Sequence, residues 1–152
     1  MHRPKSKSVF ACFAIENNPA ERISALEAIF YKEIATILPY ECNETKPYPH
    51  GEFIEMMSEH EFVLSPPGNM DADCHRTWEA LYLGCIPICK RMGATKFFTD
   101  LPILFVDDWR EITPGRLFEA SMELAPKWKN AHKMLWMPYW EKRIRGIIEN
   151  SR

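Results

Sequence analysis

The sequence predicts one α/β domain of the Rossmann-like type, with helices on both faces of a mostly parallel sheet. Short apolar runs typical of buried strands alternate along the chain with longer segments of helical periodicity. Because each strand is followed by a helix, we expect parallel strands joined by right-handed crossovers. A chain of 152 residues with 46% hydrophobic and 26% charged residues has the length and composition of a single globular domain.

The first unit is predicted to be a strand followed by a helix. The strand is predicted over residues 8–14, because the apolar run of residues 9–15 is too short to span a membrane before it meets Glu16. The helix is expected to begin at Pro19, with Asn18 as its N-cap and Glu21 completing a capping box. Its inward face is expected to carry the apolar residues at helical spacing: Ile23, Leu26, Ile29, Phe30 and Ile34.

A loop and a short helix are expected next. Residues 39–51 contain three prolines and predict a loop or a partly extended crossing. Residues 52–60 predict a short helix that leads the chain to the central strand. The apolar residues of this helix that are expected to face inward are Phe53, Ile54 and Met57.

The centre of the chain predicts a strand, a loop, a helix and a second strand. The apolar residues 62–64 run into the sequence SPPGN, where prolines remove backbone donors and glycine tolerates left-handed conformations. Residues 75–83 have helical periodicity, and Gly84 is expected to end that helix before a strand begins at Ile86. The helix is predicted to place Trp78, Leu81 and Tyr82 on one face and Arg76 and Glu79 on another.

The remainder predicts a short helix over residues 94–99, a buried strand over residues 101–106 and a helix that begins at Pro114. The inner face of that last helix is expected to carry Leu117, Met122 and Leu124.

Residues 126–152 form a helical tail that is rich in aromatic and basic residues, and Pro138 is expected to kink or divide it. Aromatic residues at helical spacing are more often core or interface than a nucleic-acid surface. The net charge of -2 and the pI near 6.2 also give no electrostatic reason to expect nucleic acid as a partner.

The loop that follows residues 62–64 lies where a parallel sheet commonly binds phosphate groups. It precedes the N-terminus of a helix, which offers unpaired N–H groups and a partial positive charge. Arg76 and Glu79 lie three residues apart on that helix. A cation and a carboxylate at this place suit a diphosphate and a ribose hydroxyl pair, respectively. The alternative is an ordinary surface ion pair between the two side chains.

Further cations are expected near the same edge of the sheet. Arg22, one turn into the first helix, is a candidate to reach an anion at the end of the preceding strand. Lys90 and Arg91 follow the strand that begins at Ile86 and are candidates to face phosphates. Simple exposure to solvent is the alternative for each of the three.

Two stretches of the chain resemble a known family. The run SPPGN, followed by DCHRTWEALYLGCIPI, resembles the donor-binding signature of exostosin-like glycosyltransferases and their ribitol-xylosyltransferase-like relatives, which have the GT-B fold. The segment DLPILFVDDW, residues 100–109, is also similar to that family. One position departs from the pattern, because Met70 stands where a second glycine usually follows the Gly-Asn pair.

The resemblance implies a nucleoside diphosphate sugar as donor substrate, with Arg76 near the pyrophosphate and Glu79 on the ribose. These two are the expected catalytic residues, and the scheme requires no metal or other cofactor. It also implies a glycan or glycoprotein acceptor, bound in the cleft between two Rossmann-like halves, of which this chain has length only for the donor-binding one. The last helix would then present an apolar face to that N-terminal half. The expected donor-binding residues are Pro67, Gly68, Asn69, Asp73, His75, Arg76, Glu79, Arg22 and Lys90.

Other classes of function remain as alternatives. Asp71, Asp73, Cys74 and His75 could be taken as a metal cluster, but residues this close in one segment rarely converge on one ion. A thiol hydrolase is equally disfavoured, because adjacent Cys and His seldom reach each other. The main competitor is a truncated or degenerate module that binds a nucleotide or a partner chain without catalysis. The five cysteines do not imply a disulfide framework.

Overall fold

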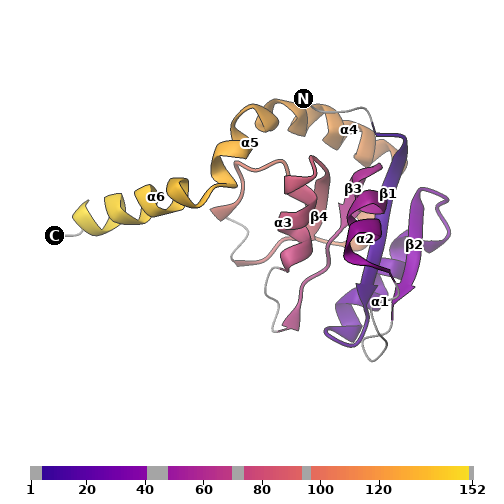
Figure 1. Cartoon of the computed structure of the whole chain (residues 1–152). Coiled ribbons are helices and arrows are strands. Elements are labelled where there is room, and N and C mark those ends of the chain that lie inside the picture. Colours follow the sequence, from indigo (N-terminus) through magenta and orange to yellow (C-terminus); the bar gives the residue numbers. More distant parts are fainter. Residues whose placement is uncertain (1–4, 41–47, 70–73, 94–96, 151–152) are drawn as a thin grey trace.

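A computed structural model describes residues 5–40, 48–69, 74–93 and 97–150 of the chain. It contains a five-stranded sheet of order β2-β1-β3-β4-β5, in which every pairing is parallel (Figure 1). The fold class predicted from the sequence is therefore confirmed. The strands are β1 (Lys7–Ala14), β2 (Ala35–Tyr40), β3 (His60–Leu64), β4 (Ile86–Lys90) and β5 (Leu104–Val106).

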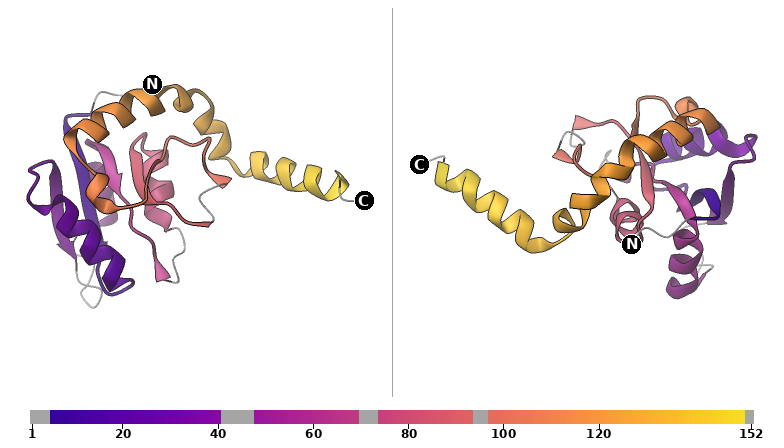
Figure 2. Two further views of the ribbon diagram at one scale, coloured as in Figure 1. Left: turned by 180° about the vertical axis from the view of Figure 1, so that it is seen from behind. Right: turned by 90° about the horizontal axis from the view of Figure 1, so that it is seen from above.

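Helices cover both faces of the sheet and give the domain three layers. The α-helices are α1 (Pro19–Phe30), α2 (His50–Ser58), α3 (His75–Tyr82), α4 (Pro114–Leu124), α5 (Trp128–Met134) and α6 (Met137–Asn150). Two short 3₁₀ helices accompany them, η3 (Trp109–Glu111) and η4 (Ala125–Lys127). Figure 1 shows α2 and α3 in front of the sheet, and the reverse view in Figure 2 brings α1 and α4 to the front.

The side chains of β1 alternate between the two faces, as the two-residue period of a strand requires. Val9, Ala11 and Phe13 pack in one core cluster with residues of α1 and α4. Phe10 and Cys12 pack in a second cluster with residues of α2 and α3. Because β1 is buried on both faces, its sequence is an almost continuous apolar run rather than an alternating one.

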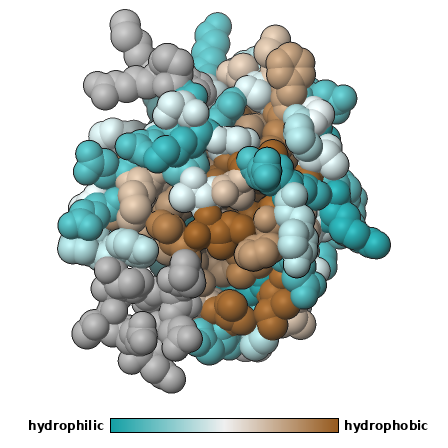
Figure 3. Space-filling model, turned by 90° about the vertical axis from the view of Figure 1, so that its right-hand side faces the viewer, coloured by the Kyte–Doolittle hydropathy of each residue, from teal (hydrophilic) through white to brown (hydrophobic). Residues whose placement is uncertain are grey.

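The strand β2 was not predicted. The sequence from Pro39 onward has the composition of a loop, and residues 35–38 were assigned to no element. The register pairs Val9 with Ala35 and Phe13 with Pro39. A proline is tolerated there because β2 is the edge strand and pairs only with β1 in the described sheet. Figure 3 views this side of the molecule, where β2 and α1 lie, and shows apolar side chains gathered across it.

The helices bury faces that differ in part from the predicted ones. On α1, Ile23 and Phe30 are exposed; on α4, Met122 is exposed. In both helices the buried face includes a fully buried alanine. The buried residues are Arg22, Ala25 and Ile29 on α1, and Leu117, Ala120 and Leu124 on α4.

The helix α3 ends where the sequence predicts, and its buried residues come from both of the faces that the sequence distinguishes. Gly84 has a φ of +69°, the left-handed conformation that favours glycine at this position. The N–H of Gly84 donates to the carbonyl of Leu81 at 3.1 Å, and that of Cys85 donates to Ala80 at 2.8 Å, which together form a Schellman motif. Arg76 lies on the buried side of α3, whereas Tyr82 is 64% exposed.

The tail divides into two helices near the predicted place. The helix α5 ends at Met134, and Pro138 lies in the first turn of α6, where the missing N–H of proline costs nothing. The helix α6 has no buried residue and extends away from the sheet in every view of the ribbon (Figures 1 and 2). No helix of the described residues is long and apolar enough to cross a membrane.

The buried side chain of His60 connects three elements at the amino-terminal edge of the sheet. Its Nδ1 lies 2.7 Å from the carbonyl oxygen of Met56, which can only accept, so Nδ1 carries the proton. The Nε2 then accepts a hydrogen bond from the hydroxyl of Thr36 at 2.8 Å. Burial lowers the pKa of His60, although the hydrogen bond to Met56 opposes this effect. The folded chain therefore favours the neutral form of the His60 ring.

We expect the free energy of unfolding to fall as the pH falls from about 7.5 to about 5.5. A histidine whose pKa is lowered by folding stabilises the protein above its unfolded pKa, and this stabilisation is lost as the pH falls through the folded pKa. Urea unfolding at both pH values measures the effect, and each tenfold difference in proton affinity between the folded and unfolded chain contributes about 1.4 kcal/mol. The variant His60→Gln should lose much of the pH dependence, whereas His132→Gln, at an exposed position, should keep it. Equal pH dependence in the two variants would contradict the assignment.

Candidate functional site

The predicted site residues gather at the carboxyl-terminal edge of the sheet, where the segments after β1 and β3 and the start of α3 meet. Pro66 and Pro67 follow β3 and are buried, and Gly68 is half-buried. The N–H of Ser65 donates to the carbonyl of Ile88 at 2.9 Å, which extends the pairing of β3 with β4 by one residue. The loop therefore leaves the sheet from a fixed position.

Arg22 is buried and holds this loop against the end of β1. Only 3% of the residue is exposed. Its Nε donates to the carbonyl of Pro67 at 3.2 Å, and a second nitrogen donates to the carbonyl of Ala14. The alternative of a solvent-exposed Arg22 is therefore wrong. The N–H groups of Arg22 that were expected to reach an anion donate to the carbonyls of Pro67 and Ala14. Its contacts make it a positioning residue for the loop.

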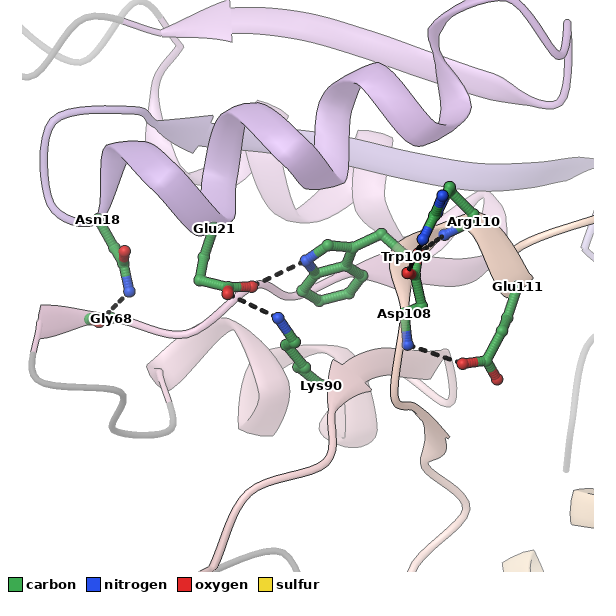
Figure 4. Close-up of polar contacts among 8 residues, drawn as sticks. All are labelled: Asn18, Glu21, Gly68, Lys90, Asp108, Trp109, Arg110 and Glu111. Atoms are coloured by element: carbon green, nitrogen blue, oxygen red, sulfur yellow. Dashed lines mark hydrogen bonds and ion pairs between the residues drawn. The ribbon is translucent and has the colours of Figure 1, made fainter.

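Asn18 also contacts the loop after β3 rather than capping its own helix. Its Nδ2 donates to the carbonyl of Gly68 at 3.2 Å, as Figure 4 shows. The side chain makes no capping hydrogen bond to α1. The predicted capping box is therefore wrong, although the helix begins at Pro19 as expected. The N-cap position brings Asn18 close enough to the loop for this contact.

Arg76 is the predicted site residue with the most unusual surroundings. It is only 8% exposed, and its guanidinium lies over the ring of Phe13 at 5.2 Å from the centroid. One terminal nitrogen lies 3.6 Å from the Sγ of Cys74, and the buried Nε has no hydrogen-bond partner. No ion pair joins Arg76 to Glu79, nor to any other carboxylate in the described segments. The alternative of a surface ion pair is therefore wrong.

A buried guanidinium without a carboxylate is costly to the folded state. Removing an ion from water costs several kcal/mol even after the protein has relaxed around it. Cation–π attraction to the face of Phe13 offsets about 0.5–2 kcal/mol of this desolvation cost. The guanidinium of Arg22 lies over the same ring at 5.8 Å, so a second positive charge is also close. An anion that reached Arg76 would compensate this arrangement.

Lys90, a predicted phosphate-binding cation, is paired with a carboxylate in this structure. Its Nζ lies 2.6 Å from Oε1 of Glu21, and Oε2 of Glu21 accepts from the indole Nε1 of Trp109 at 3.0 Å (Figure 4). Partial burial opposes ionisation of Glu21, but the hydrogen bonds from Lys90 and Trp109 and the charge of Lys90 outweigh it and lower the pKa of Glu21. The three residues connect α1, β4 and η3.

Arg91, the cation that directly follows β4, also has a carboxylate partner. Its Nε lies 3.1 Å from Oδ1 of Asp107, and both side chains are more than half exposed. The following residue, Asp108, caps η3 and accepts from the Arg110 side chain at 2.6 Å (Figure 4). The hydrogen bonds from Arg110 hold the pKa of Asp108 well below its ordinary value. The charges after β4 and β5 thus largely neutralise one another.

A chain of hydroxyl and thiol groups lies beneath the loop. The Oγ of Ser65 lies 3.1 Å from the Sγ of Cys74 and 2.9 Å from the Oγ1 of Thr77. Thr77 in turn lies 3.6 Å from the Sγ of Cys89. The chain connects β3, α3 and β4, and it ends at Arg76 through Cys74.

The other predicted site residues are spread around the start of α3. His75 and Asn69 are exposed, and Glu79 is half-buried one turn along the helix from Arg76. Asp73 lies outside the described residues, as does Asp71 of the alternative metal cluster. Among the described residues, no group of three or more His, Cys, Asp or Glu side chains could hold a metal ion.

Four further residues belong to the site although the sequence did not predict them. They are Phe13, Glu21, Ser65 and Trp109. Phe13 carried a usable signal, because it lies near the carboxyl end of a strand that adjoins the predicted phosphate loop. Glu21 and Trp109 are 88 residues apart in the sequence, and no local pattern indicates that they meet.

No model of a known protein family matches the chain, and no curated protein matches it. Functional inference therefore rests on the geometry of this edge and on the sequence resemblance described above.

We expect the change Glu21→Ala to lower the free energy of unfolding by about 1–3 kcal/mol. It removes the partner of the Lys90 ammonium and of the Trp109 indole N–H, and an unsatisfied polar group in a largely buried position costs about that much. Urea unfolding of the variant measures the change. Glu27→Ala, which removes a carboxylate from the same helix, is the matched control. Equal effects of the two substitutions would show that the Glu21 contacts do not stabilise the chain.

Proposed function

We propose that this chain is a glycosyltransferase donor domain that binds a nucleoside diphosphate sugar at the carboxyl edge of its sheet. The observation that carries the proposal is the buried guanidinium of Arg76, which has no carboxylate partner among the described residues. An anionic ligand would supply the missing charge. A diphosphate also suits the position beside the first turn of α3, where backbone N–H groups are unpaired.

The loop after β3 has the properties that a phosphate site requires. Its carbonyls at Pro67 and Gly68 are engaged by Arg22 and Asn18, so they point to protein donors. A bound anion would then meet fewer carbonyl oxygens, which repel it. Because the protein supplies these two contacts before any ligand arrives, residues 67 and 68 would need little ordering on binding.

In the proposed reaction a hydroxyl oxygen of the acceptor bonds to the anomeric carbon of the sugar and loses its proton to solvent, while the bond between the anomeric carbon and the β-phosphate oxygen breaks. The bonding pair departs with the nucleoside diphosphate, which gains negative charge as it leaves. Arg76 and the N-terminus of α3 would stabilise that charge, and stabilisation of charge that develops in the transition state is a large catalytic effect. Glu79, one turn further along α3, would orient the donor through the ribose hydroxyls.

The proposed acceptor is a glycan or glycoprotein, bound between this domain and a second Rossmann-like half. The exposed tail supports a second half, because α6 has no buried residue while three isoleucines on it are more than half exposed. They are Ile144, Ile147 and Ile148. A helix with such an apolar surface is stabilised by packing against another surface.

The second candidate is a module that binds the nucleotide or a partner without catalysis, and the same exposed helix supports it. The two candidates differ in turnover. An enzyme would release nucleoside diphosphate from the bound donor in the presence of an acceptor or of water. A module would bind the donor and leave it intact.

We expect UDP or GDP, or one of their sugar conjugates, to stabilise the purified chain by about 2.7 kcal/mol at a hundred times its dissociation constant. Thermal unfolding measures this stabilisation. The variant Arg76→Gln should lose it because the ligand loses its cation, while Arg116→Gln, which removes the same charge from α4, should keep it. If no nucleotide raises the temperature of a cooperative transition, or if Arg76→Gln keeps the full stabilisation, the proposed donor site is wrong.

The change Glu79→Gln should weaken the nucleotide and leave inorganic pyrophosphate unaffected. Glu79 is assigned to the ribose, which pyrophosphate lacks, whereas Arg76 is assigned to the phosphates that both ligands share. A lost charge-assisted hydrogen bond corresponds to about a tenfold or greater loss of nucleotide affinity. Isothermal titration calorimetry with both ligands measures it. Equal weakening of the two ligands would remove Glu79 from the ribose and place it near the phosphates.

A further inference from the structure

Cys74 is the one cysteine of the described segments that is not buried. It precedes α3 as its N-cap residue, and its side chain makes no capping hydrogen bond. Its Sγ instead lies 3.1 Å from the hydroxyl of Ser65 and 3.7 Å from the carbonyl of Pro66. The thiol is therefore held at a defined place and can still be reached from solvent.

The guanidinium of Arg76 lies beside this thiol. Its terminal nitrogen is 3.6 Å from the Sγ of Cys74, and its buried Nε has no hydrogen-bond partner. Reactive cysteines are typically partly exposed thiols near a cation or a helix N-terminus. The positive charge of Arg76 would also attract an anionic reagent to the thiol.

We propose that Cys74 is a modification site for anionic disulfides of low molecular weight, such as glutathione disulfide. We further propose that a modified Cys74 and a bound phosphate group exclude each other, which rests on the proposed function. In the reaction the thiol gives its proton to solvent, and its sulfur attacks one sulfur of the disulfide. A mixed disulfide forms, the original S–S bond breaks, and the second sulfur leaves as a thiolate that takes up a proton.

We infer the exclusion from the closeness of the Cys74 sulfur to the guanidinium that is proposed to bind the phosphates. A disulfide bond is about 2.05 Å long, which is well below the 3.6 Å between the Cys74 sulfur and the Arg76 nitrogen. The added sulfur and its anionic substituent would lie against the guanidinium and occupy the position proposed for the donor phosphates. The modification would thus switch off donor binding, and a reducing thiol would restore it.

The other thiols do not compete for the reagent. Cys12, Cys85 and Cys89 are buried. Burial raises the pKa of Cys12, against the charge of Arg76, and also raises the pKa of Cys85, against Lys5. Cys42 lies outside the described residues, so it is replaced by serine in every protein used for the test.

The first test compares alkylation by iodoacetate, an anion, with alkylation by neutral iodoacetamide. We expect one rapidly reacting thiol, absent from Cys74→Ser. The ratio of the iodoacetate rate to the iodoacetamide rate should fall several-fold in Arg76→Gln and stay unchanged in Arg116→Gln. Steric differences between the variants affect both reagents, so they largely cancel in the ratio. An unreactive Cys74, or an unchanged ratio in Arg76→Gln, would overturn the modification site.

The second test uses inorganic pyrophosphate and an anionic aromatic disulfide whose released thiolate is coloured. At ten times the dissociation constant found by calorimetry, pyrophosphate should slow the reaction of Cys74 about tenfold, because only the free protein reacts. Treatment with glutathione disulfide should abolish pyrophosphate binding to the chain but not to Cys74→Ser. An unchanged rate while pyrophosphate is bound would overturn the exclusion. Failure of pyrophosphate to bind the untreated chain would refute the proposed function and the exclusion, while the alkylation ratio still decides the modification site.

Discussion

All five strands of the sheet run in one direction, and the chemistry of the molecule depends on this constraint. Parallel strands bring their carboxyl ends to one edge, so the residues that follow β1, β3 and β4 meet although they are far apart in sequence. Three cations arrive there on α1, α3 and β4. Arg22 binds backbone carbonyls, and Lys90 binds a carboxylate. Arg76 lies beside a thiol and an aromatic ring. Arg22 and Lys90 therefore hold the edge together through protein partners, whereas Arg76 is suited to a ligand.

This division explains why a buried charge is tolerated. Arg22 keeps the loop after β3 in place, and the Glu21 contacts hold α1 against β4 and η3. None of these hydrogen bonds involves Arg76. The protein can therefore carry the cost of one incompletely satisfied guanidinium, and under the proposed function that cost would be relieved by a bound anion. Strain of this kind is commonly concentrated at functional sites and compensated elsewhere in the structure.

The sequence predicted the order of most elements because their signals are local. Gly84 and Pro114 identify a helix end and a helix start through backbone conformation alone. The edge strand β2 was missed because its proline and the polar segment after it resemble a loop. The helix faces differ from the predicted ones because apolar periodicity favours large side chains, whereas each buried face also includes an alanine. Local propensity determines where elements begin and end, and tertiary packing determines which face is buried.

The site was predictable in its location but less so in its contacts. The loop and the α3 N-terminus follow from the alternation of strands and helices, so Pro67, Gly68 and Arg76 were placed at the correct edge. The partners of Arg22 and Lys90 are residues far along the chain, and a single sequence contains no signal for such pairings. Charge alone therefore identified three candidate cations, while burial and pairing distinguished among them. A basic residue near a phosphate loop is the better candidate for a ligand when no carboxylate pairs with it, and of these three residues Arg76 has a buried Nε without a hydrogen-bond partner and no carboxylate partner within the described segments.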